Sequence, residues 1–195
     1  EPLASLILTQ MVSRDLEEEA KAYIDPEKGV ETAQQALEGA QDIIAEQISD
    51  QADYRAWIRN LTMKEGVLVS EAKDESAESV YEMYYQFQEP VKKLAGHRIL
   101  ALNRGEAEKF LNVKIQFPEE EILRYLEKKV IVRDNPHTSP LLKEAAADSY
   151  KRLIAPAIER EIRSSLTETA EDGAIKVFGK NLTQLLMQPP VSGHV

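Results

Sequence analysis

The sequence predicts a mainly α-helical protein, a multi-helix assembly with at most one small β element near residues 67–73 and 110–117. Of its 195 residues, 43% are hydrophobic, which is enough to bury a core and excludes a fully disordered chain. With only 8 glycines and 9 prolines, the chain has few of the residues that tight turns require. Long segments instead repeat apolar residues at spacings of three and four, the period of one helical face. An all-β fold is therefore not expected.

Residues 1–66 are predicted to form helices. An apolar stripe that starts at Leu3 runs into a charged stretch, and Asp25-Pro26 ends it, because the residue before a proline is driven out of the α conformation. Apolar residues then recur along one helical face at Val30, Ala33, Leu37, Ala40, Ile44 and Ile48. Asp50 is a good N-cap for the next helix, whose apolar side includes Trp57.

The middle of the chain carries the predicted β element. Val67-Leu68-Val69 is predicted to be extended, and residues 112–117 alternate polar and apolar side chains, which is the period of a half-buried strand. The aromatic residues between positions 80 and 87 are predicted to pack in the core. Their charged neighbours are glutamates, whereas base-stacking surfaces pair aromatic rings with lysine and arginine. Residues 98–104 favour a helix because of their leucine, alanine and arginine content.

The last third of the chain is predicted to be helical on both sides of one loop. A helix follows Pro118, because its first turn is acidic and its last turn basic, as the helix dipole favours. Residues 134–140 form the clearest loop, with Ser139 as the next N-cap. An apolar stripe then runs from Leu142 to Leu186, and Pro156 must kink or split it. We therefore expect two regions: residues 1–134, which could include a helix-turn-helix-like part around 50–110, and the long kinked helical segment 140–188.

The formal net charge of −10 argues against a chain that binds polyanions with its whole surface, because such proteins are usually basic. The charge is uneven along the chain. Residues 1–60 carry 5 basic and 13 acidic side chains, whereas residues 86–139 carry 10 basic and 8 acidic ones. The acidic runs are predicted to be solvated helix faces, and the mildly basic middle could contact a phosphate backbone.

The sequence contains no pattern typical of catalysis or metal binding. Because the chain has no cysteine, disulfides, thiolate zinc sites and a cysteine nucleophile are excluded. The three histidines, His97, His137 and His194, lack the Glu-x-x-His spacing of di-iron bundles. There is neither a Gly-x-Ser-x-Gly nucleophile turn nor a glycine-rich phosphate loop. We therefore expect no enzymatic activity, no cofactor and no metal.

Two groups of basic residues are the candidate contacts to nucleic acid. Arg55 and Arg59 lie four residues apart on the predicted Trp57 helix, a spacing that a helix-turn-helix element could present to DNA. The alternative is that they pair with neighbouring polar or acidic residues such as Asp53. The second group consists of Lys92, Lys93, His97, Arg98, Arg104 and Lys109. If its members cluster in space they form a phosphate-facing patch, and otherwise they are ordinary solvated side chains.

The setting of the chain can also be predicted. No stretch reaches the ~18 consecutive apolar residues that a membrane span needs, so no membrane association is expected. The absence of cysteine fits a reducing, intracellular compartment. The chain starts at Glu1 without a methionine and shows no signal peptide, which predicts an excised piece of a longer protein.

A series of motifs runs through the chain in order. They are Asp25-Pro26-Glu27-Lys28-Gly29-Val30, Ala36-Leu37-x-Gly39-Ala40-x-Asp42-Ile43, Glu65-Gly66-Val67-Leu68-Val69-Ser70, the run from His97 to Glu106, Ala145-Ala146-Ala147-Asp148-Ser149-Tyr150-Lys151-Arg152-Leu153-Ile154, Glu159-Arg160-Glu161-Ile162-Arg163, Leu166-Thr167-Glu168, and the tail from Asn181 to Val191. This series, which covers essentially the whole chain, resembles the Tex family of bacterial transcription accessory proteins.

The resemblance implies a largely helical, cytoplasmic protein that binds RNA or DNA and acts in transcription. In that family the matching region immediately precedes an RNase-H-like domain, helix-hairpin-helix repeats and an oligonucleotide-binding barrel, which this sequence lacks. The implied function is a helical scaffold that positions those domains and adds secondary phosphate contacts. The alternative is a module that docks proteins of the transcription machinery through the acidic residues 1–60. A nuclease fragment would need carboxylates from the absent RNase-H-like domain.

Overall fold

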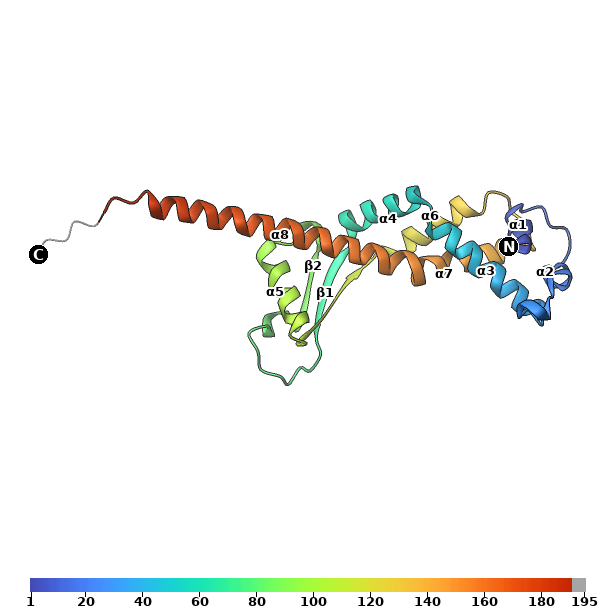
Figure 1. The fold of residues 1–195 in the computed structure, drawn as a ribbon, viewed down its shortest axis with the longest axis horizontal. Helices are drawn as coiled ribbons and strands as arrows, with labels where there is room; N and C mark the ends of the chain where they lie inside the picture. The colour runs from blue at the N-terminus through green and yellow to red at the C-terminus, as the bar shows by residue number, and fades with distance from the viewer. Residues whose placement is uncertain (191–195) are drawn as a thin grey trace, which may run out of the picture. The chain divides into compact units, whose positions relative to one another are not determined.

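The computed structural model describes residues 1–190, and it confirms a mainly α-helical protein with one small antiparallel sheet (Figure 1). The main elements in chain order are α1 (Pro2–Leu8), α2 (Leu16–Ala20), α3 (Ala33–Ser49), α4 (Ala52–Glu65), β1 (Val67–Ala72), β2 (Gln86–Pro90), α5 (Gly96–Ala107), β3 (Leu111–Gln116), α6 (Glu119–Val130), α7 (Ser139–Asp148) and α8 (Ala155–Leu186). Short 3-10 turns include η3 (Glu82–Tyr84) and η4 (Val91–Lys93). Within the described residues, none of the helices combines the length and hydrophobicity that a membrane span requires.

The chain forms two compact units, each built from segments that are distant in sequence. Unit 1 consists of Glu1–Thr62 and Phe117–Ile158, and unit 2 consists of Met63–Gln116 and, among the described residues, 159–190. The boundary that the sequence suggests, between residues 134 and 140, falls inside unit 1. A loop signal marks where the chain turns, but it does not show which distant helices share a core.

The core of unit 1 is organised around α3. Its buried side chains are Ala36, Ala40, Ile44, Ala45 and Ile48. Alanines on this face, and Ala145 and Ala146 on α7, allow α3 and α7 to pack closely against each other. The hydroxyl of Ser149, which is fully buried, donates to the carbonyl of Ala45 at 2.7 Å. The helical spacing therefore predicts the correct face of α3, including Ala40, Ile44 and Ile48.

Two amide side chains connect the N-terminal segment of unit 1 to the α6–α7 loop. Gln10 is buried, and its Oε1 accepts from the amides of Val132 and Arg133 at 3.0 Å each, while its Nε2 donates to the carbonyl of Val130 at 2.9 Å. Asn135 donates through Nδ2 to the carbonyl of Val12 at 2.9 Å. These bonds satisfy backbone groups that have no helical or strand partner.

Helix α7 continues through a π-helical turn, Ser149–Ile154, into α8. The amide of Ala155 donates to the carbonyl of Tyr150, five residues back instead of the four of an α-helix. Pro156 follows directly, and a proline removes a backbone donor and crowds the carbonyl four residues earlier. The irregularity predicted at Pro156 therefore takes the form of a π turn just before it, and α8 continues to Leu186.

Unit 2 contains the sheet, in which β1 lies between β2 and β3 and pairs antiparallel with both. Pro90 of β2 pairs with Val67, and an edge strand tolerates a proline because no further strand needs its missing donor. Helix α5 packs against β3. At Gly105 the approach is so close that a Cβ atom would lie 2.5 Å from Cδ1 of Leu111, which only glycine avoids.

The sheet and its connections differ from the prediction in one strand and one motif. The predicted β segments correspond to β1 and β3, but β2 at residues 86–90 was not predicted. Tyr81 and Tyr84 are buried, as the core prediction requires, whereas Val80 is exposed.

A helix-turn-helix joins two helices by a short turn, but residues 66–95 between α4 and α5 include β1 and β2. The helix pair suggested around residues 50–110 is therefore not seen between α4 and α5.

Two predicted helix caps are displaced. Asp50 is the C-cap of α3 in an α conformation, and α4 begins only at Ala52, so Asp50 is not the N-cap of α4. Helix α7 begins at Ser139 with Thr138 as its N-cap, one residue before the predicted position. The amides of His137 and Thr138 instead donate to Oδ1 of Asn135, at 2.8 and 3.1 Å. The Asn135 side chain thus stabilises the loop before α7, and no side-chain hydrogen bond caps the helix itself.

Candidate functional site

The predicted basic contacts are divided between the two units. Arg55 and Arg59 lie on α4 in unit 1, and both interact with other residues of the structure. Arg55 is half-buried and Arg59 is exposed. The other six residues all lie in unit 2, on or beside α5.

The start of α5 gathers three exposed basic side chains. Lys92 and Lys93 lie in η4, three residues before α5, and His97 lies in the first turn of the helix. All three are exposed, and none of them forms an ion pair with another of residues 1–190. We refer to Lys92, Lys93 and His97 as the basic cluster.

Arg98 is adjacent in sequence but is held by the sheet. Its Nη1 lies 3.7 Å from Oε2 of Glu89 on β2, and its guanidinium lies 5.5 Å from the centre of the Phe87 ring. Because one carboxylate and one aromatic face already engage it, the Arg98 charge is partly neutralised and its position is set by β2. The structure therefore separates Arg98 from the solvent-facing basic cluster.

Arg104 and Lys109 lie at the other end of α5. Arg104 is two helical turns after His97, which is ~10 Å along the helix axis and on the same face. Lys109 follows the end of the helix with a left-handed φ of 67°. Both side chains are exposed. Burial is the main cause that raises the pKa of the Tyr81 hydroxyl, and its hydrogen bond with Glu108 raises the pKa further. The six residues therefore fall into the basic cluster, Arg98 held by β2, and the pair Arg104 and Lys109.

Arg163 of α8 joins α5 and β3 and was not among the predicted residues. Its Nη2 and Nη1 contact the two carboxylate oxygens of Glu106 at 2.8 and 3.0 Å. Nη2 also donates to Oδ1 of Asn103 at 3.0 Å, and Nη1 donates to the carbonyl of Val113 at 3.2 Å. Asn103 in turn donates to Oγ1 of Thr167 at 2.8 Å. This network neutralises the charge of Glu106 on α5.

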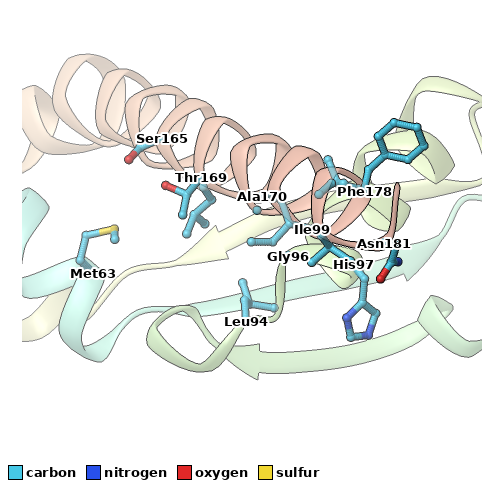
Figure 2. A pocket seen from close by; sticks show the side chains of 15 residues that line it. Met63, Leu94, Gly96, His97, Ile99, Ser165, Thr169, Ala170, Phe178 and Asn181 are labelled. Atoms are coloured by element: carbon cyan, nitrogen blue, oxygen red, sulfur yellow. The ribbon is translucent and has the colours of Figure 1, made fainter. Parts of the chain in front are cut away.

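An open apolar groove of about 800 Å³ lies beside the basic cluster in unit 2. Its walls come from Met63 near the end of α4, from Leu94 and the start of α5, and from residues 165–181 of α8 (Figure 2). Figure 2 shows Met63 and Leu94 on the side facing α8, with Thr169 and Ala170 on the α8 side and His97 near Asn181. The lining residues used below are Met63, Leu94, Gly96, His97, Gly173 and Val177.

The end of α8 exposes a second apolar surface. The stripe predicted from Leu142 to Leu186 is buried at Ile158, Ile162 and Ala170, but no residue from Glu171 to Leu186 is buried. The exposed apolar residues spaced by three and four on one face are Ile175, Phe178, Leu182, Leu185 and Leu186. We refer to these five residues as the α8 stripe.

The histidines and acidic residues do not assemble into a metal site within the described chain. Among residues 1–190, no group of three His, Asp or Glu side chains is close enough to hold a metal ion. His97 lies at the groove, and His137 lies in the α6–α7 loop, where its amide binds Asn135. His194 lies outside the described residues.

Comparisons with known proteins place the chain in a family. Residues 12–178 match the model of the Tex central region-like family. The chain is 49% identical to YdcI of Bacillus subtilis (strain 168) over 99% of its length and 27% of that protein. It is 34% identical to human S1 RNA-binding domain-containing protein 1, over 89% of the chain and 19% of that protein. It is 31% identical to the protein tex of Bordetella pertussis, over 97% of the chain and 26% of that protein.

The chain thus spans between 19% and 27% of the length of these three relatives. The family match covers most of the chain, from Val12 to Phe178, and includes the motifs around residues 25–43, 97–106 and 145–168. It also includes Arg163 and the basic cluster. This chain therefore belongs to the Tex central region-like family and is related to transcription accessory proteins.

Proposed function

We propose that this chain is the helical scaffold segment of a Tex-like transcription accessory protein, in which it positions nucleic-acid-binding parts of the longer protein. The proposed role is binding and positioning without catalysis, in the bacterial cytoplasm where transcription takes place. One relative is named transcriptional accessory protein Tex and another is named for an S1 RNA-binding domain. Since the chain matches only a part of each relative, a role that joins it to other parts agrees with these similarities.

The α8 stripe is the observation that carries this proposal. Ile175 and Phe178 are each 69% exposed and Leu186 is 76% exposed. A continuous apolar row in water is unfavourable and typically marks an interaction surface. A helical segment without tertiary packing is also only marginally stable. A further part of a longer protein that packs on the stripe would remove both disadvantages.

The double variant Ile175→Glu with Leu182→Glu is expected to weaken binding between this chain and the rest of a Tex-like protein by at least about tenfold. The reason is that two carboxylates would be buried without partners in an apolar contact. The measurement is calorimetry with the portion of YdcI that this chain does not match, supplied as a separate polypeptide.

Val177→Glu is the matched control. Val177 is also on α8, but it lines the groove and does not belong to the α8 stripe. It is expected to bind the YdcI portion as the unchanged chain does. The scaffold proposal is contradicted if the unchanged chain does not associate, or if the stripe variant and the control bind equally well.

We further propose that the basic cluster, together with Arg104 and Lys109, adds secondary contacts to the phosphate backbone of RNA or DNA. Lys92, Lys93 and His97 are exposed without an ion pair among the described residues, which leaves their donors available to phosphate. Arg104 lies on the same face of α5 as His97, so one backbone could pass both. Arg98, which is held by Glu89, is expected to contribute less.

Charge reversal of the cluster, Lys92→Glu with Lys93→Glu, is expected to weaken nucleic-acid binding about tenfold or more at low salt. Each lost phosphate contact should also make the dependence of log K on log salt shallower by ~0.7 to 0.9. The measurement is titration against single- and double-stranded RNA and DNA at two salt concentrations. Lys73→Glu with Lys114→Glu makes the same change in charge at exposed positions outside the cluster. Equal effects of both pairs, or no binding at low salt, would refute the phosphate contacts without affecting the scaffold proposal.

A further inference from the structure

We propose that the groove between Leu94, the start of α5 and residues 165–181 of α8 is a docking site for an amphipathic α-helix of a partner protein, with an apolar face and acidic flanks. The groove shares Phe178 with the α8 stripe, but most of the α8 residues that line it, Val177 among them, face a different direction around the helix. Val177 lies two residues after Ile175, which at 100° per residue places the two side chains ~160° apart around the helix.

The shape of the groove fits a helix. Part-way along the groove α5 and α8 meet, since a Cβ atom on Gly96 would lie 3.3 Å from Cα of Ala170. One turn further along α8, a Cβ atom on Gly173 would have no neighbour within 4 Å. The space opens at that point, and the missing side chain of Gly173 lets another backbone approach α8 closely.

The length of the groove also fits a helix. The α8 residues that line it extend from Ser165 to Asn181, which corresponds to ~24 Å of helix, or more than four turns. A helix that lies along such a groove inserts apolar side chains at positions i, i+3, i+4 and i+7. The apolar side chains of Met63, Leu94 and Val177 line the space into which they would insert.

The charges beside the groove specify the flanks of that helix. His97 lines the groove, Lys93 precedes the lining residue Leu94, and Lys180 lies one turn after Val177 on α8. None of these three side chains is in an ion pair with another of residues 1–190. Cations around an apolar groove favour a partner whose polar flanks carry glutamate or aspartate. A second copy of this chain is disfavoured, since each copy has a net charge of −10.

The test uses a synthetic helical peptide as the probe. It is about 18 residues long, which is ~27 Å as a helix, with leucines at helical spacing on one face and glutamates on both flanks. A second peptide replaces every glutamate with lysine. Fluorescence anisotropy measures the affinity of each peptide for the full 195-residue chain and for two variants, Val177→Glu and Ile175→Glu.

The two variants introduce the same charge two residues apart on α8. Val177 is 61% exposed and Ile175 is 69% exposed, so neither change should unfold the chain, and circular dichroism checks this. We expect the acidic peptide to bind the unchanged chain and Ile175→Glu equally, and to bind Val177→Glu at least about tenfold more weakly, as for truncation of an interface anchor. The lysine-flanked peptide should bind the unchanged chain about tenfold more weakly than the acidic one.

Several outcomes would overturn the proposal. They are no binding of the acidic peptide, equal binding of both peptides, or equal losses in Val177→Glu and Ile175→Glu. Sedimentation that shows a dimer broken by Val177→Glu would assign the groove to a second copy of the chain instead. Because the scaffold experiment depends on Ile175 and this one on Val177, either proposal can fail while the other stands.

Discussion

Replacing Gln10 with alanine is expected to lower the free energy of unfolding by about 3 kcal/mol. The side chain is 4% exposed and makes three hydrogen bonds to the backbone around the end of α6. Alanine would leave the carbonyl of Val130 and the amides of Val132 and Arg133 without this partner. Each such unpaired group costs about 1 kcal/mol or more where water cannot replace the lost bond. Urea denaturation followed by circular dichroism measures the change.

The matched control is Gln47→Ala on α3, where the glutamine is exposed and alanine suits a helix interior. That variant should differ from the unchanged chain by less than about 0.5 kcal/mol. Asn135→Ala combined with Gln10→Ala should lose less than the sum of the two single losses, because both side chains hold the same loop. A loss below about 1 kcal/mol for Gln10→Ala would show that this bridge is not important for stability.

Replacing Arg163 with methionine is expected to lower the free energy of unfolding by about 2 kcal/mol. The Arg163 side chain is 19% exposed and bonds to Glu106, Asn103 and the carbonyl of Val113. Because the Glu106 side chain is 39% exposed, water screens that ion pair and the pair itself contributes little. Most of the loss comes from the bonds to the half-buried Asn103 side chain and to the carbonyl of Val113, a buried residue. Methionine keeps most of the packing of the arginine stem.

Hydrogen exchange locates the effect of Arg163→Met, which should be greatest at the amides of β3 and the end of α5. Arg163→Lys should recover only part of the stability, because an ammonium cannot make the two parallel bonds to a carboxylate. Arg160→Met, at an exposed position on α8, is the control and should change little. Equal destabilisation by Arg160→Met and Arg163→Met would mean that the network does not stabilise unit 2.

The helices could be predicted from the sequence because their signals are local. Proline at residues 26 and 118, the acidic first turn after Pro118 and the apolar spacing on α3 all act within one or two turns of the chain. β2 was missed for the opposite reason. Gln86–Pro90 has few β-branched residues and ends in proline, and it is a strand because β1 supplies its hydrogen-bond partners.

The candidate site could be predicted only in part. The sequence indicates Lys92, Lys93 and His97 as candidate phosphate contacts, and the structure places all three exposed at or just before the start of α5. No local pattern indicates that Arg98 is engaged by Glu89, or that Arg163 neutralises Glu106 from a helix 57 residues away in the sequence. The groove likewise depends on α5 and α8 meeting at Gly96 and Ala170.

The sequence by itself determined the class of fold, most of the helices, two of the three strands and the family of the chain, because periodicity, proline positions and motifs are properties of neighbouring residues. Only the tertiary structure decided the composition of the two units, the burial of α8 up to Ala170 and its exposure beyond, and which charges remain unpaired. These features depend on contacts between residues far apart in the chain. Burial and electrostatic pairing are set by what surrounds a side chain in space, and a single sequence does not specify those distances.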